Sequence, residues 1–180
     1  MSQDQELQLT VPISDIDHVR GPKHAHVTIV EYADFECPNC KQAAPVVKLL
    51  LERFGDRVRY AYRHFPLEGV HPYAMHAAQA SEAAGGQGKF WQMHDLLFEH
   101  QNHLKLPQLH GYAEKLELEM ARYTGEMDDE VYLQRVREHM EGATHSGVRA
   151  TPAFFINGVI HDVSFGVHSL VDGVEAALKK

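Results

Sequence analysis

The only two cysteines in the 180-residue chain, Cys37 and Cys40, are separated by Pro38 and Asn39. They lie where an alternating apolar run gives way to a pattern typical of a helix. Two intervening residues allow the sulfurs to come within bonding distance across the first turn of a helix. Two thiols kept at this spacing are best suited to redox chemistry, in which a dithiol and a disulfide interconvert.

The predicted helix also makes the two thiols unequal. Pro38 suits the first helical position, because the amide hydrogen that proline lacks would have no partner there. Cys37 then occupies the N-cap, where free backbone N–H groups and the positive end of the helix dipole stabilise a thiolate. A cysteine with a pKa of about 8.5 is only about 3% thiolate at pH 7, whereas one with a pKa near 6 is roughly 90% thiolate. We therefore expect Cys37 to be the nucleophile and Cys40 the resolving cysteine.

Two other uses of the cysteine pair fit less well. A zinc site needs four ligands, commonly two cysteines and two histidines at finger-like spacing. The next histidines after Cys40 are His64 and His71, and neither the loop length nor the ligand interval matches, so we predict no metal site. A purely structural disulfide closing so short a loop would constrain little of the unfolded chain and would stabilise the fold weakly.

Composition and charge argue against several classes of function. The chain is 44% hydrophobic and 23% charged, as in globular proteins, and no apolar stretch reaches the roughly 18 residues that span a bilayer. The net charge of -8 at pH 7, without a cluster of Lys or Arg, argues against nucleic-acid binding. Residues 1–6 have neither the positive nor the apolar region of a secretory signal. The sequence as given therefore predicts a cytoplasmic protein, and an exported one only if a signal had been removed.

The periodicity of apolar residues predicts the elements around the cysteine pair. Residues 1–25 form a polar arm able to add a short edge strand. We expect strands at 26–35, 57–65, 153–156 and 159–163, and helices at 38–54 and 169–178. Residues 67–147 have a helical pattern, with breaks at Gly85-Gly86, at Pro107 and around Gly125. The first two core strands should be parallel, since a helix connects them by a right-handed crossover.

This order of elements predicts the fold class. An order of β-α-β, then helices, then β-β-α predicts an α/β protein with a thioredoxin fold and a helical insertion between the second and third core strands. Residues 26–66 and 149–180 would form the thioredoxin-like domain, with 1–25 as an N-terminal arm and 67–148 as the inserted helical domain.

Three motifs stand out along the chain: EYADFECPNC at Glu31–Cys40, HFPL at His64–Leu67 and TPAFFING at Thr151–Gly158. Together they resemble the DsbA family of thiol:disulfide oxidoreductases, in its DsbA-like thioredoxin-domain branch. The resemblance runs over nearly the whole chain from about Asp17 onward. It implies an enzyme that exchanges disulfides with protein substrates, needs no cofactor and depends on a redox partner for recycling.

The resemblance also implies roles for residues outside the cysteine pair. In the family the proline of the Thr-Pro pair is cis and lies beside the cysteines, so Pro152 should fill that role and expose the backbone of Thr151 to an extended substrate. Phe65 and the inserted helices are expected to border the same groove. Related proteins carry a buried acid six residues before the first cysteine, and Glu31 occupies that position. Such a carboxylate, with a pKa raised by burial, could relay the proton of Cys40.

One position departs from the family pattern. The best-known oxidant of the family carries histidine where this chain has Asn39, which cannot bring a positive charge to the thiolate. We expect this to raise the pKa of Cys37 relative to that oxidant and to place the redox potential between about -270 and -120 mV.

Two further interpretations remain open. The fold could serve as a redox-sensing or partner-binding module whose disulfide changes affinity without turnover. It could also serve glutathione-linked isomerase chemistry, although relatives of that kind typically lack an intact CxxC motif, which this chain keeps.

Overall fold

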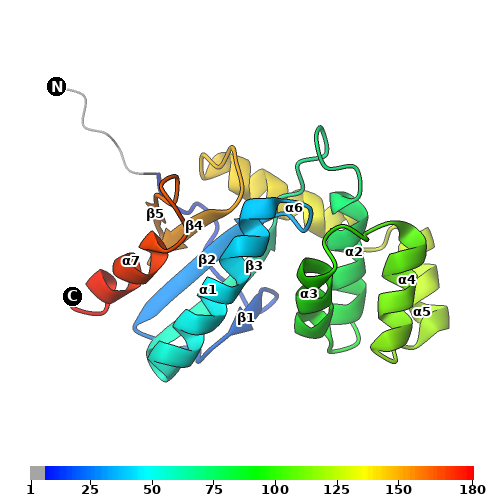
Figure 1. The fold of residues 1–180 in the computed structure, drawn as a ribbon, viewed down its shortest axis with the longest axis horizontal. Helices are drawn as coiled ribbons and strands as arrows, with labels where there is room; N and C mark the ends of the chain where they lie inside the picture. Colours follow the sequence, from blue (N-terminus) through cyan, green and yellow to red (C-terminus); the bar gives the residue numbers. More distant parts are fainter. Residues whose placement is uncertain (1–6) are drawn as a thin grey trace.

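The computed structural model describes residues 7–180. Its centre is a five-stranded sheet with strand order β1-β3-β2-β4-β5 (Figure 1). The strands are β1 (His18–Arg20), β2 (Val27–Ala33), β3 (Val58–His64), β4 (Ala153–Ile156) and β5 (Val159–His161). Only β2 and β3 run parallel, and the other neighbouring pairs of described strands are antiparallel. The predicted α/β thioredoxin-like fold is confirmed.

The two central strands are buried along almost their whole length. β2 and β3 each have one half-buried residue, at their second position, and the rest are buried. Such nearly continuous burial is expected of a strand whose two faces are both covered. Their register places Ile29 opposite Tyr60 and Glu31 opposite Tyr62. A glutamate on β2 and two tyrosines on β3 therefore meet inside the protein.

Helix α1 (Pro38–Phe54) connects these strands and has the predicted bounds. Its buried face packs on the sheet and presents Cys40, Ala43, Val46, Val47, Leu50 and Phe54. The helix ends where Gly55 adopts a positive φ of 53°, a conformation that glycine reaches at little cost, and the Gly55 N–H donates to the Leu51 carbonyl.

The predicted helical segment between β3 and β4 contains α2 (Ala74–Gly85), α3 (Phe90–Glu99), α4 (Leu106–Lys115), α5 (Met120–Asp128) and α6 (Leu133–His145). Figure 1 shows α2 to α5 gathered beyond the β1-β3 edge of the sheet and α7 (Ser169–Ala177) beside the β4-β5 edge. The breaks expected at Gly85-Gly86 and Pro107 coincide with helix ends, but the break expected around Gly125 is wrong, because Gly125 lies inside α5. An interior glycine costs a helix only about 1 kcal/mol, which tertiary packing offsets.

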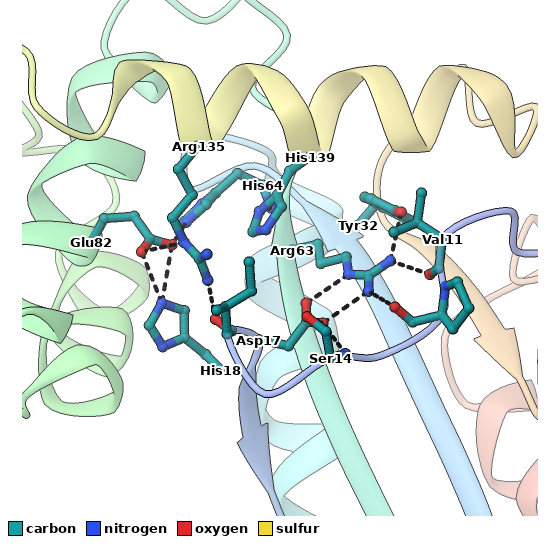
Figure 2. Close-up of polar contacts among 12 residues, drawn as sticks. Val11, Ser14, Asp17, His18, Tyr32, Arg63, His64, Glu82, Arg135 and His139 are labelled. Atoms are coloured by element: carbon teal, nitrogen blue, oxygen red, sulfur yellow. Dashed lines mark hydrogen bonds and ion pairs between the residues drawn. The ribbon is translucent and has the colours of Figure 1, made fainter.

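The N-terminal arm supplies the predicted edge strand, because β1 pairs with β3. The arm is also held by Arg63, whose side chain is only 2% exposed. Its guanidinium donates to the Asp17 carboxylate at 2.8 and 3.0 Å and to the carbonyls of Val11 and Pro12 at 2.7 and 2.9 Å (Figure 2). Residues 1–6 of the predicted arm lie outside the described residues.

Candidate active site

Cys37 is the N-cap of α1, as predicted. Its backbone is extended, with φ of -72° and ψ of 120°, and Pro38 occupies the first turn. The Cys37 N–H donates to the Asp34 carbonyl at 3.1 Å, which closes the turn from β2 into the helix. The Cys37 carbonyl accepts from the Lys41 N–H at 3.2 Å, the first hydrogen bond of the helix. The sulfur of Cys37 therefore lies at the positive end of α1.

The two thiols are free and differ strongly in acidity. A hydrogen bond from the Cys40 thiol lowers the pKa of Cys37 to about 5, with help from the backbone N–H groups of Asn39 and Cys40 and against the effect of burial. Burial raises the pKa of Cys40 well above its ordinary range, and its bond to Cys37 and the negative charge of Glu31 add to this effect. Cys37 thus ionises while Cys40 keeps its proton.

The Thr151-Pro152 bond is cis and lies next to Cys37, as predicted. The Thr151 carbonyl accepts a hydrogen bond from Cys37 Sγ at 3.4 Å. Because a carbonyl can only accept, this contact favours the protonated thiol. The Cys40 thiol, the Thr151 side chain and the N–H groups of Cys40 and Asn39 are what lower the pKa of Cys37.

A hollow of about 520 Å³ opens beside this contact. It is lined by Asn39 and Gln42 of α1, by residues 150–153 and by residues 160–164, 166 and 167. Cys37, Asn39, Thr151 and Pro152 are therefore brought together as expected. Of the residues expected at this groove, Phe65 does not line the hollow as the structure describes it for residues 7–180. Its side chain packs against a smaller apolar cluster around Val30 and Ala61, and its N–H donates to the Ala33 carbonyl at 2.8 Å.

Glu31 is buried beneath α1, with 2% of its surface exposed. The hydroxyl of Tyr60 donates a hydrogen bond to its Oε2. Burial raises the pKa of Glu31 to about 8, against the effect of the Tyr60 hydrogen bond and with a further contribution from the negative charge of Cys37. The expected burial and raised pKa are both present.

The sequence did not single out Tyr60. Alternation along β3 places Tyr60 and Tyr62 on the same face. Which of the two hydroxyls meets Glu31 depends on side-chain directions between strands, which a single sequence does not contain.

Asp34 is a second buried carboxylate that the sequence did not assign. One of its oxygens accepts from the Glu36 N–H at 2.7 Å. The other accepts from the Leu67 N–H at 2.8 Å and lies 2.6 Å from Nδ1 of His71. Asp34 therefore connects, by hydrogen bonds, the segment after β3 with the turn that carries Cys37.

Gln101, in the connection between α3 and α4, supports the same turn from the insertion. Its side-chain amide donates to the carbonyls of Phe35 and Cys37 at 2.8 and 2.9 Å. The inserted segment thus contacts the active-site turn, although within residues 7–180 none of its helices lines the hollow, where we had expected them to border the groove. Nothing in the sequence near Gln101 predicts this contact.

His64, Glu82 and His139 are the described residues whose donor atoms lie close enough together, within 4.8 Å, to consider a metal. The Glu82 carboxylate is already engaged, by His18 at 3.0 Å, by His64 at 2.8 Å and by Arg135 at 2.7 Å (Figure 2). A fixed guanidinium at that distance opposes a second cation. The cluster is therefore best described as a buried hydrogen-bonded ion network.

A family model described as thioredoxin matches residues 14–176. The chain belongs to the thioredoxin family. Among solved structures, this thioredoxin-family chain is similar to oxidised BdbD from Bacillus subtilis, with a TM-score of 0.80 and 22% identity over 90% of this chain and 92% of that one. It is similar to a thioredoxin-like oxidoreductase from Silicibacter pomeroyi DSS-3, with a TM-score of 0.79 and 26% identity over 91% and 93%. It is also similar to alpha-DsbA1 of Wolbachia pipientis, with a TM-score of 0.81 and 20% identity over 95% and 94%. The predicted resemblance to the DsbA family is confirmed.

Curated relatives of this thioredoxin-family chain are much longer. It is 49% identical over 172 residues to Na(+)/H(+) antiporter NhaA 1 of Salinispora arenicola, covering 95% of this chain and 26% of that protein. It is 42% identical over 156 residues to Na(+)/H(+) antiporter NhaA of Herminiimonas arsenicoxydans, covering 86% and 25%. The chain therefore spans about a quarter of the length of these relatives. In residues 7–180, no helix has both the length and the apolar character needed to cross a membrane.

Proposed function

We propose that the protein is a dithiol–disulfide oxidoreductase that exchanges disulfides with protein substrates through Cys37-Pro38-Asn39-Cys40. The observation that carries the proposal is the pair of unequal thiols at the start of α1, next to the Thr151-Pro152 backbone and an open hollow. The similarity to solved structures of the DsbA type, one of them a thioredoxin-like oxidoreductase, supports it.

In the proposed exchange, two electrons and two protons leave a substrate dithiol. A substrate thiolate attacks Cys37 Sγ of the oxidised protein, the bond between the two active-site sulfurs breaks, and Cys40 takes up a proton. A second substrate thiolate then attacks the substrate sulfur of the mixed disulfide. The substrate disulfide forms and Cys37 leaves as a thiolate. A redox partner, itself a dithiol or disulfide, reverses these steps and recycles the protein.

The low pKa of Cys37 bears on the direction of exchange. A thiol of low pKa leaves readily, and a stabilised thiolate favours the reduced form of the protein, which makes the disulfide more oxidising. The pKa of about 5 lies between the roughly 7 of thioredoxin and the roughly 3.5 of DsbA. This supports the expected potential between about -270 and -120 mV.

The hollow beside Pro152 is the proposed contact for the substrate chain. The backbone at Thr151 would pair with an extended peptide, as when a strand is added to a sheet edge. Asn39 lies on one wall, and the segment 160–167 forms another. Phe165 is fully exposed, between two residues of that wall, so it is placed to contact an apolar side chain of the substrate.

The proposal is tested by insulin reduction and by oxidative refolding of a reduced, disulfide-containing protein. Wild type should catalyse exchange, and Cys37→Ser should lose all of it. Cys40→Ser, the matched control, should still attack but accumulate a mixed disulfide that is visible on a non-reducing gel. Equal turnover by wild type and Cys37→Ser would overturn the proposal.

A second candidate is a redox-sensing module that acts through binding instead of turnover. It is favoured by the match of 95% of this chain to part of a protein described as a Na(+)/H(+) antiporter. If it holds, the reduced and oxidised protein should differ in affinity for the rest of such an antiporter in detergent, and should change Na⁺/H⁺ exchange in proteoliposomes. Catalytic turnover together with equal binding of both redox forms would exclude it.

A further inference from the structure

The buried Glu31 has an unusual set of neighbours. The groups that face it are Tyr60 and Tyr62 from β3 and the two cysteines from α1. Its register partner on β4 is the apolar Phe154. Within residues 7–180, therefore, no cation contacts this carboxylate, and the only side-chain hydrogen bond to it comes from Tyr60.

Tyr60 also connects this buried site with solvent. It lines a hollow of about 380 Å³ between α1 and α3. Three other residues of that lining, Lys41, Lys48 and Glu99, are exposed, so the hollow opens to the surface. The ring of Tyr60 packs near Trp91, with ring centroids 5.9 Å apart, and the side chain is otherwise enclosed. One side chain thus contacts both the carboxylate and a route to water.

We propose that Tyr60 is a positioning residue for proton transfer in disulfide exchange: its hydrogen bond favours the proton-accepting carboxylate form of Glu31, and its hydroxyl passes the accepted proton to solvent through the hollow between α1 and α3. The inference rests on the proposed function.

The step in which the proposal acts is the resolution of a mixed disulfide on Cys37. The Cys40 thiol gives its proton to the Glu31 carboxylate, and the Cys40 sulfur attacks Cys37 Sγ. The bond between Cys37 and the substrate sulfur breaks, and its electron pair leaves on the substrate thiolate. The protonated Glu31 then gives its proton to the Tyr60 oxygen while the Tyr60 hydroxyl proton passes to solvent, and both side chains return to their starting state.

The chain offers a matched control for the hydroxyl. Tyr62 lies two residues along the same strand, faces the same side and is equally buried. Its hydroxyl has no hydrogen-bond partner among the described residues. Tyr60→Phe and Tyr62→Phe therefore remove the same atom from the same strand, and only the first removes the bond to Glu31.

The experiment follows the reaction of the reduced protein with 5,5′-dithiobis(2-nitrobenzoate) by stopped flow at different pH values. Attack by Cys37 releases the first thionitrobenzoate, and attack by Cys40 on the resulting mixed disulfide releases the second. The rate of the second release should rise with pH as Glu31 ionises, with a midpoint at or below about 8, because Cys37 is uncharged in the mixed disulfide. Tyr60→Phe should move this midpoint up by about 1 to 2 pH units and slow the second release at pH 7 about 10-fold.

Controls separate this inference from the proposed function. Tyr62→Phe should keep the wild-type midpoint, and Glu31→Gln should abolish the pH-dependent rise. A Tyr60→Phe profile equal to that of Tyr62→Phe, with a normal first release, would overturn the role of Tyr60 and leave the exchange activity intact. Absence of the second release from the wild type would instead sink the proposed function.

A measurement on the wild type does not depend on the stability of any variant. Glutamate labelled with carbon-13 at the side-chain carboxyl lets NMR follow the titration of Glu31 in the reduced protein. A midpoint well above 4.5 supports the premise of the inference, that Glu31 exchanges a proton near neutral pH, and a midpoint near 4.5 removes that premise and the inference with it.

Discussion

Glu31 and Glu82 are two glutamates buried to nearly the same extent, with 2% and 3% of their surfaces exposed, yet their environments act in opposite directions. Glu31 on β2 accepts a hydrogen bond from the neutral hydroxyl of Tyr60, and burial raises its pKa to about 8. Glu82 on α2 is also penalised by burial, but hydrogen bonds from His18 and His64 outweigh that penalty and hold its pKa well below the ordinary range.

The comparison shows that burial alone does not decide what a carboxyl group does. With basic neighbours, the charge of Glu82 is permanent and connects α2 with β1, β3 and α6 (Figure 2). With a neutral neighbour, Glu31 can exchange a proton near neutral pH, beside the thiols that need one. The first is a structural ion, and the second suits proton transfer.

The largest effect that tests this comparison is on stability. Glu82→Gln leaves the partly buried guanidinium of Arg135 without its carboxylate, so the free energy of unfolding at pH 7 should fall by about 3 to 5 kcal/mol. Glu31→Gln at the same pH replaces a mostly protonated acid by an amide of the same shape and should change stability by less than about 1 kcal/mol. Urea denaturation of both variants measures the difference, and similar losses would show that the two sites are alike.

The next effect is the pH dependence of stability from Glu31. Between about pH 4.5 and 8 the folded protein keeps a proton on Glu31 that the unfolded chain has released, so stability falls as pH rises through this window. We expect a loss of roughly 2 to 4 kcal/mol for the reduced wild type. Glu31→Gln should match the wild type near pH 5 and be more stable near pH 9. Parallel stability curves across this range would contradict the raised pKa.

Below about pH 6.5, the buried histidines around Glu82 should make the largest contribution to the loss of stability. Burial lowers the pKa of His139 to about 3, and burial lowers that of His64 too. The unfolded chain binds protons on these residues below about pH 6.5 and the folded protein does not, so stability falls as pH falls from there. Because His139 is only partly buried, His139→Gln should recover only about 1 to 2 kcal/mol at pH 4.5. Thermal unfolding of both proteins at pH 7 and 4.5 checks this prediction. If His139→Gln lost as much stability as the wild type between these pH values, residues other than His139 would be responsible for the loss.

The smallest effect concerns the shape of the cation beside Glu82. Arg135 donates to Glu82 through Nε and to the Ile16 carbonyl through a terminal nitrogen. Arg135→Lys keeps the charge but cannot make both bonds, so we expect a loss of about 0.5 to 1.5 kcal/mol. A loss as large as that of Glu82→Gln would mean that geometry, and not charge, is decisive here.

The two glutamates also differ in how well the sequence predicts them: the position of Glu31 was predicted, and the ion network of Glu82 was not. Features set by local signals were predicted well. The bounds of α1 follow from Pro38 at its start and Gly55 after its end, and the N-cap position of Cys37 follows from the same signals. The place of Glu31 was predicted because it lies at a fixed offset from Cys37 in a motif that resembles a family.

Partners far apart in the chain were not predicted. Glu82 lies in an alanine-rich helix, and its partners are 64, 18 and 53 positions away. Tyr60 meets Glu31 across 29 positions, through the pairing of β2 with β3. Phe65 was expected at the groove from the family resemblance, but it packs against the smaller apolar cluster around Val30 and Ala61. Such contacts depend on register and helix packing, which one sequence specifies only through the complete fold.

The contact between Cys37 and Thr151 joins positions 114 residues apart, with the whole helical insertion between them. A ribosome makes the chain from its N-terminus, so the two cysteines emerge long before the segment that covers them. During that interval the nucleophilic sulfur is open to any oxidant or disulfide that reaches the nascent chain. The contact that covers Cys37 in the folded protein is therefore among the last that the growing chain can make.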